Sequence, residues 1–211
     1  MADTGSTIFL GRCLVGAGIV TALFWLSTAP FETFAGAEVA SHVLFVPGQV
    51  LHVAGALLTI FGYIGLFQLI RPEAGRFSLS AFVLAVLGAA FFFGDGIIAL
   101  VVFPMLAQHA PELIEATGPL FTGRVLGFFV LFAATNMIGT VLFGAAAMLS
   151  RLVPWAACLL LIAGGVLANL PPLPGMHLVL VTGGVLWGAG AIWLGYAVVQ
   201  KARADSLSLS S

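Results

Sequence analysis

The feature of this sequence that most constrains its fold is the apolar run from Ala81 to Met105, AFVLAVLGAAFFFGDGIIALVVFPM. Roughly 20 consecutive apolar residues are enough to cross the bilayer core of about 30 Å as a helix. The run contains one charged residue, Asp95, which lies between Gly94 and Gly96. A carboxylate inside a membrane span costs about 3 kcal/mol on insertion scales, so Asp95 is a candidate functional residue.

The composition indicates that lipid, rather than water, surrounds much of the chain. Of the 211 residues, 61% are hydrophobic and 7% are charged, whereas a soluble domain has about 25% charged residues. A soluble fold of this length has too little interior to bury so much apolar surface. The net charge of −1 provides no basic field for nucleic acid, so no nucleic-acid partner is expected. Cys13 and Cys158 lie in apolar runs and are expected to be packing residues rather than a disulfide.

Six apolar runs are each long enough to span a bilayer as a helix, although the fifth is short. They cover residues 8–28, 48–70, 79–103, 123–149, 153–170 and 176–199. The period-2 alternation of a membrane β-barrel is absent, so helices must satisfy the backbone polar groups. We therefore predict an all-α, six-span transmembrane bundle that forms one domain over residues 1–205, followed by a disordered tail over 206–211.

The basic residues predict how the bundle is threaded. Arg124 is the only one of the seven Lys and Arg residues that falls on the side opposite the two termini. By the positive-inside rule both termini should be cytoplasmic, which fits a multi-pass protein of the bacterial plasma membrane. Ala35-Gly36-Ala37 resembles a signal-peptide cleavage site. However, residues 1–7 carry no positive charge and the first run is longer than a usual signal-peptide core, which favours an uncleaved first span.

Polar residues within or beside the runs predict a pocket in the outer half of the bundle. Asp95 lies roughly 6 Å outward of the midpoint of its span, and His52 lies about 10 Å outward of the midpoint of the preceding one. Asn169 ends the fifth run at a similar depth, and Arg124 lies near the outer mouth of the fourth. Asn136 heads a stripe of small residues in that same fourth span. These five residues are the candidate ligand-binding set.

The histidines suggest an alternative, a metal protein or membrane enzyme. All four histidines fall in the outer half, and histidine with carboxylate is a ligand set for zinc or copper. The candidate metal ligands are His42, His109, His177, Glu38 and Glu112. No HxxxH, HExxH or GxSxG motif accompanies them. Only His52 lies clearly within a span, so a bis-His haem site lacks a second ligand, and the cofactor stays unknown.

A glycine stripe in the last span suggests another alternative, a non-catalytic partner subunit. Gly184, Gly188, Ala191 and Gly195 share one helix face. Small residues on one face let helix backbones approach closely. The stripe predicts close helix packing, either inside the bundle or against a helix of an oligomer or partner membrane protein.

From Gly123 onward the chain resembles uncharacterised multi-pass membrane proteins of bacteria. The shared features are a basic residue, here Arg151, before Pro154-Trp155-Ala156 at the start of a leucine-rich span, and a closing Trp-Leu-Gly-Tyr at 193–196. The resemblance implies a helical integral membrane protein and transfers no catalytic residue. Among the three hypotheses, the sequence favours a small transporter or ligand-binding membrane protein with an outward-facing polar pocket around Asp95.

Overall fold

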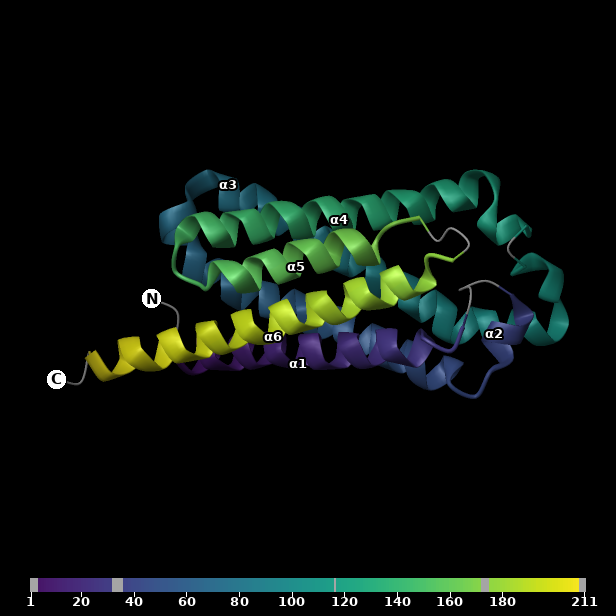
Figure 1. The fold of residues 1–211 in the computed structure, drawn as a ribbon, viewed down its shortest axis with the longest axis horizontal. Helices are drawn as coiled ribbons and strands as arrows, with labels where there is room; N and C mark the ends of the chain where they lie inside the picture. The colour runs from purple at the N-terminus through teal and green to yellow at the C-terminus, as the bar shows by residue number, and fades with distance from the viewer. Residues whose placement is uncertain (1–3, 32–35, 116, 172–174, 209–211) are drawn as a thin grey trace.

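A computed structural model describes residues 4–31, 36–115, 117–171 and 175–208, which form helices and joins with no strand among them. The all-α fold class is therefore confirmed for these residues. The helices lie side by side as an elongated bundle (Figure 1). The elements are α1 (Thr4–Thr28), α2 (Ala37–Ser41), α3 (Phe45–His109), the 3-10 helices η1 (Pro111–Leu113) and η2 (Pro119–Phe121), α4 (Gly123–Ser150), α5 (Trp155–Ala168) and α6 (His177–Ser208).

Each predicted apolar run coincides with helix in the structure. Among the described residues, four helices are long and apolar enough to cross a membrane: α1, α3, α4 and α6. Helix α5 is also apolar but has only 14 residues. The runs 48–70 and 79–103 both fall within the 65 residues of α3.

Helix α3 is two antiparallel segments that meet at Gly75. This residue has φ 60° and ψ −148°, which no helix can contain. The chain folds back there, as Figure 1 shows at the end of the bundle that holds both termini. Two stacked ring pairs join the segments: the ring centroids of Phe67 and Phe82 are 4.4 Å apart, and those of Phe45 and Phe103 are 6.4 Å apart. A single glycine thus divides one long stretch of helical backbone into two bundle helices.

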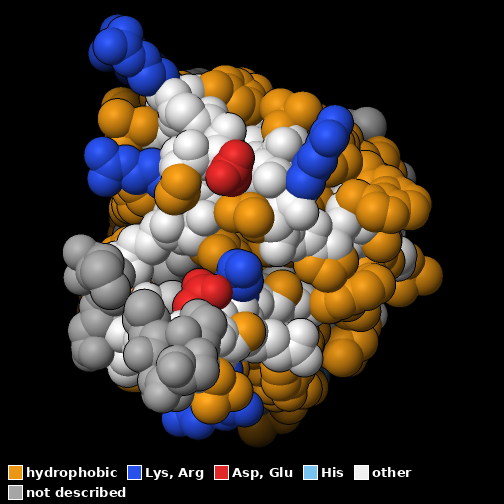
Figure 2. Space-filling model, turned by 90° about the vertical axis from the view of Figure 1, so that its left-hand side faces the viewer, with side chains coloured by type: hydrophobic (Ala, Val, Ile, Leu, Met, Phe, Trp, Pro, Cys, Tyr) orange, Lys and Arg blue, Asp and Glu red, His pale blue; other side chains and the backbone are white. Residues whose placement is uncertain are grey.

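Basic side chains gather at the end of the bundle that holds the termini. The Gly75 turn and the join between α4 and α5 lie at this end as well (Figure 1). Figure 2 looks onto the end and shows Lys and Arg side chains spread over it, with apolar side chains on the flank. Arg124, in the first turn of α4, belongs to the opposite end.

The glycine stripe of α6 packs against α1 of the same chain. A Cβ atom added to Gly188 would lie 2.6 Å from the Gly18 carbonyl oxygen, and one added to Gly195 would lie 2.7 Å from the Gly11 carbonyl oxygen. A Cβ atom on Gly184 would overlap the Trp25 ring. The stripe therefore provides close packing inside the bundle, and these glycines are not free for the partner helix that was the alternative.

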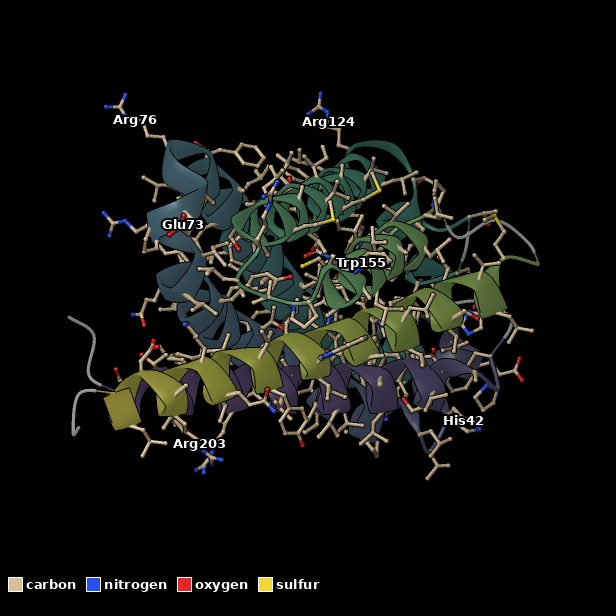
Figure 3. All side chains as sticks on the ribbon, turned by 60° about the vertical axis from the view of Figure 1, so that its left-hand side comes forward. His42, Glu73, Arg76, Arg124, Trp155 and Arg203 are labelled. Carbon is tan, nitrogen blue, oxygen red and sulfur yellow. The ribbon has the colours of Figure 1, made fainter. Side chains whose placement is uncertain are left out.

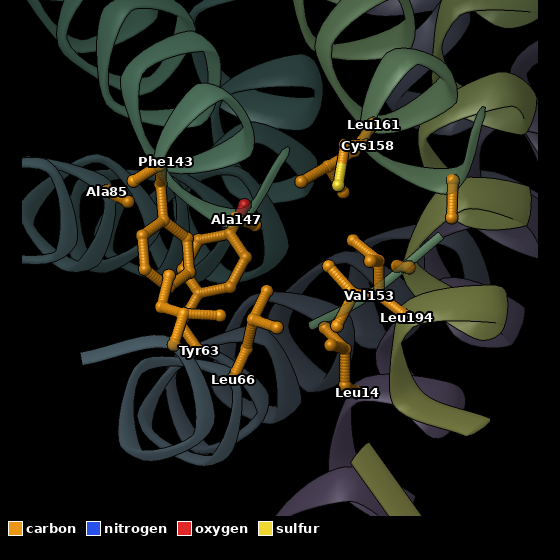
Figure 4. Packing of buried hydrophobic residues seen from close by; sticks show 14 of the residues in the cluster. Leu14, Tyr63, Leu66, Ala85, Phe143, Ala147, Val153, Cys158, Leu161 and Leu194 are labelled. Carbon is orange, nitrogen blue, oxygen red and sulfur yellow. The ribbon is translucent and has the colours of Figure 1, made fainter. Parts of the chain in front are cut away.

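The half of the bundle nearest the termini is tightly packed. Its centre is an edge-on contact between Tyr63 of α3 and Phe143 of α4, with ring centroids 5.0 Å apart. Figure 4 shows side chains from several helices converging around this pair. Fully buried residues of the cluster come from every long helix and from α5: Leu14, Tyr63, Leu66, Phe143, Leu161 and Leu194.

A smaller cap closes the opposite end. The NH of Gly36 donates to the carbonyl of Ile114 at 2.8 Å, and the NH of Ala37 donates to Glu115 Oε1 at 3.3 Å. Ile114 is fully buried in a second apolar cluster with Phe45 and residues of the second α3 segment. The end of the bundle nearest the termini is thus densely packed, and the cap closes the opposite end. Helix α4 runs along the region between these two ends.

Helix α6 continues into the segment predicted to be a disordered tail. Residues 206–208 form the end of α6 in the structure, and residues 209–211 lie outside the described part of the chain. An i,i+4 ion pair joins Lys201 Nζ to Asp205 Oδ1 at 3.5 Å, and the Ser206 hydroxyl donates to the Arg203 carbonyl at 2.7 Å. These local contacts support the final helical turns.

Candidate ligand-binding cavity

A cavity of about 620 Å³ lies in the half of the bundle away from the termini. Ligand pockets typically measure about 300–1,000 Å³. Its walls come from α1, both segments of α3, α4, and the chain around the end of α5 and the start of α6. Most of the lining is apolar, and aromatic side chains dominate it: Phe24, Trp25, Phe31, Phe45, Phe92, Phe103, Phe121 and Phe129.

Helix α4 borders this cavity over its outer half, where it has no fully buried residue. Its first buried residue is Gly139, although the helix begins at Gly123. Beyond Gly139, Gly165 of α5 fits closely against Thr140, and Gly144 fits against Ile162. Over its outer half α4 contacts the second α3 segment through the stacked rings of Phe91 and Phe132, whose centroids are 4.4 Å apart. Phe129 and Ala134 of this half border the cavity.

Asp95 borders the cavity with a carboxylate that has no partner. No residue in the described ranges donates a hydrogen bond to it or forms an ion pair with it. A Cβ atom on the preceding residue, Gly94, would meet nothing within 4 Å. The carboxylate is therefore available to a ligand, because no hydrogen bond or ion pair within the described ranges uses it.

His52 approaches the same space from the first segment of α3. Its ring packs between Phe24 and Phe92, with centroid distances of 4.5 Å and 5.5 Å. Gly96 allows the second segment to come this close, because a Cβ atom there would lie 3.0 Å from Val53 Cγ2 and 3.4 Å from His52 Cγ. The fold at Gly75 thus brings His52 and Asp95, distant in sequence, to one cavity.

Two buried polar atoms in the lining lack hydrogen-bond partners within the described structure. They are His52 Nε2 and Gln49 Oε1. Buried polar atoms nearly always have a partner, and leaving one unpaired costs about 1–3 kcal/mol. Gln49 was missed in the sequence, although it lies three residues before His52 and so on the same helix face. Both atoms are suited to bind a polar group of a ligand.

A smaller space of about 60 Å³ lies beside the main cavity and shares His52 and Asn169 with it. Asn136 borders this smaller space, and its Nδ2 donates to Asn169 Oδ1 at 3.3 Å. Asn169 Nδ2 in turn donates to the Gly165 carbonyl at 2.7 Å. The two side-chain amides are largely occupied by hydrogen bonds to each other and to the backbone. They therefore form a polar part of the lining rather than a free binding group.

Arg124 does not belong to the cavity. Its side chain is exposed and points away from the bundle from the first turn of α4 (Figure 3). The sequence placed Arg124 at about the depth of the cavity mouth. The depth of a residue along a helix does not determine in which direction around the helix axis its side chain points. A long cationic side chain near a helix end reaches most easily toward polar surroundings. Of the five predicted residues, Asp95, His52, Asn136 and Asn169 border the two spaces.

Two of the candidate metal ligands have structural roles. His42 Nδ1 accepts a hydrogen bond from the Leu44 NH at 3.2 Å, and its ring packs edge-on against Phe31 at a centroid distance of 5.0 Å. His177 Nε2 lies 2.7 Å from the Thr28 carbonyl oxygen, which ties the start of α6 to the end of α1. Both histidines lie at the end of a helix, and their contacts hold that end in place.

The remaining metal candidates are spread over the capped end. His109, Glu38 and Glu112 are all exposed there. Within the described ranges, no group of three His, Cys, Asp or Glu side chains is placed to hold a metal ion. The alternative of an outer metal site or metalloenzyme therefore lacks a ligand cluster among these residues.

Comparisons of the sequence with protein-family models and with curated proteins found no match, and comparison with solved structures found none either. What the site can do follows from its own geometry.

Proposed function

We propose that this protein is a six-span protein of the bacterial plasma membrane that binds a small ligand in the cavity beside Asp95, as a small transporter or a ligand-binding protein. The observation that carries the proposal is a large cavity bordered by an unpartnered carboxylate and two unpaired buried polar atoms. The dense packing of the other half contrasts with it, since Tyr63, Phe143 and Leu194 are fully buried there.

The threading rests on helix lengths and on charge. The α3 segments 45–74 and 76–109 are each longer than the roughly 20 residues that a span requires. Helix α5, at about 1.5 Å per residue, covers only roughly 21 Å and would complete its crossing with the chain beyond Ala168. The basic end faces the cytoplasm by the positive-inside rule, so the cavity lies in the outer half of the membrane.

Lipid contact is supported by the apolar outer surface of the helices. Val101 of α3 is 63% exposed, and Phe128 of α4 is 61% exposed. Large exposed apolar side chains of this kind recur along α3 and α4, where a bilayer would cover them. The partner-subunit alternative has less support, because the glycine stripe that suggested it is buried against α1.

A matched pair of variants on α4 tests the proposal. Ala134 borders the cavity, whereas Leu131, one turn earlier on the same helix, is 54% exposed and does not. Ala134→Trp should fill the cavity, and Leu131→Trp should add the same ring to the lipid face. The neutral fluorophore N-phenyl-1-naphthylamine serves as probe, with the protein in phosphatidylcholine nanodiscs and empty nanodiscs subtracted.

We expect saturable binding of this fluorophore to the wild type and to Leu131→Trp, and at least tenfold weaker binding to Ala134→Trp. Absence of saturable binding to the wild type, or equal binding to all three proteins, would refute the proposed function.

A further inference from the structure

We propose that the cavity selects organic cations, with Asp95 as the counter-ion and the phenylalanine-rich wall in contact with the apolar part of the ligand. The inference rests on the proposed function and names the chemical class of its ligand.

The charge of the lining points to a cation. Asp95 is the only Asp, Glu, Lys or Arg among the described residues that border the cavity. Among the described residues, Arg124 is the one Lys or Arg at this end, and it points away from the bundle (Figure 3). A carboxylate in mostly apolar surroundings gains most from a positive partner, because Coulomb attraction is weakly screened there. An anionic ligand would meet repulsion, and a neutral ligand would leave the charge unpaired.

The aromatic wall fits the same class of ligand. Phenylalanine ring faces attract cations within about 6 Å, and such walls are the usual recognition element for quaternary ammonium groups. Phe92 lies three residues before Asp95 on the second segment of α3, so both occupy one face of that helix. Phe24, across the His52 ring from Phe92, extends the aromatic surface toward α1.

The size and chemistry of the cavity favour an organic rather than an inorganic cation. A metal ion such as calcium takes six to eight oxygen ligands, but the acidic oxygens here come from Asp95 alone. A volume of about 620 Å³ is also far larger than a bare ion needs. Gln49 Oε1, which has no partner in the described structure, could accept a hydrogen bond from a ligand that carries an N–H group.

The test uses two probes of nearly identical shape and opposite charge, tetraphenylphosphonium and tetraphenylborate. Equilibrium dialysis measures their binding to the protein in phosphatidylcholine nanodiscs, with empty nanodiscs subtracted. Asp95→Asn removes the charge and keeps the side-chain shape. Glu38→Gln is the matched control, because it removes an exposed carboxylate at the same end that does not border the cavity. N-phenyl-1-naphthylamine reports whether each variant retains the cavity.

We expect tetraphenylphosphonium to bind the wild type at least tenfold more tightly than tetraphenylborate. Asp95→Asn should weaken tetraphenylphosphonium binding at least tenfold while neutral-probe binding stays unchanged, and Glu38→Gln should resemble the wild type. If both ions bind equally, or Asp95→Asn has no effect while the neutral probe still binds, the cation inference is overturned and the proposed function stands. If no probe binds saturably, both are overturned.

Discussion

The fold-back of α3 leads to a specific prediction for Gly75. With φ 60° and ψ −148°, its backbone lies in a region that is essentially open to glycine alone. A Cβ atom there would meet nothing within 4 Å, so substitution adds backbone strain without a steric clash. Gly75→Ala should therefore destabilise the protein by about 1–3 kcal/mol. Gly75→Asn should cost as much, because asparagine tolerates the αL region but this ψ lies outside it.

Gly94 provides the matched control on the same helix. It is also open to an added Cβ atom, but its backbone is not in the positive-φ region. Gly94→Ala should be neutral or stabilising by up to about 1 kcal/mol, the difference in helix propensity. Reversible unfolding in mixed micelles with increasing dodecyl sulfate, followed by circular dichroism, gives the free energy of unfolding for each variant. Equal stability of Gly75→Ala and wild type, or equal destabilisation by Gly94→Ala, would refute the backbone argument.

Three further predictions follow from packing, charge and threading. Gly188→Leu should destabilise the protein by about 1–3 kcal/mol or more in the same unfolding assay, because it forces α6 away from α1; Gly127→Leu, where an added Cβ atom meets nothing within 4 Å, should not, and comparable losses would refute the packing account. Asp95→Leu should fold at least as stably as the wild type, because it removes a carboxylate that costs about 3 kcal/mol in lipid, yet lose tetraphenylphosphonium binding; marked destabilisation would indicate that Asp95 is structural. A cysteine at position 74 should resist a membrane-impermeant thiol reagent in intact cells while one at Glu38 reacts, and labelling of position 74 from outside would refute the threading.

The helices were predictable because a membrane imposes a strong length rule on apolar runs. Each run, including the short fifth, coincides with helix in the structure. The runs 48–70 and 79–103 were predicted as separate spans, and they lie in the two segments of α3 on either side of Gly75. In the structure Pro72 lies inside the helix and Gly75 alone makes the turn. The number of spans and the orientation in the membrane stay predictions.

The cavity was predictable in part because polar residues are rare in membrane spans. Asp95, His52, Asn136 and Asn169 stood out for that reason, and all four border the two spaces. Arg124 was assigned by depth alone, which leaves the direction of its side chain open. The phenylalanine wall could not be predicted, since phenylalanine is equally at home against lipid and inside a cavity.

The central claim, a cavity within the membrane domain that opens outward, is tested most directly by cysteine accessibility on α4. Cys13 and Cys158, which are buried, are first replaced by alanine, and Ala134→Cys and Leu131→Cys are then compared. A positively charged, membrane-impermeant methanethiosulfonate is applied to intact cells, and modification is measured by mass spectrometry. Position 134 should react from outside at least tenfold faster than position 131, although 131 is nearer the outer end of α4, because only 134 borders the cavity. An unreactive position 134, or one that reacts only after the cells are permeabilised, would contradict the account.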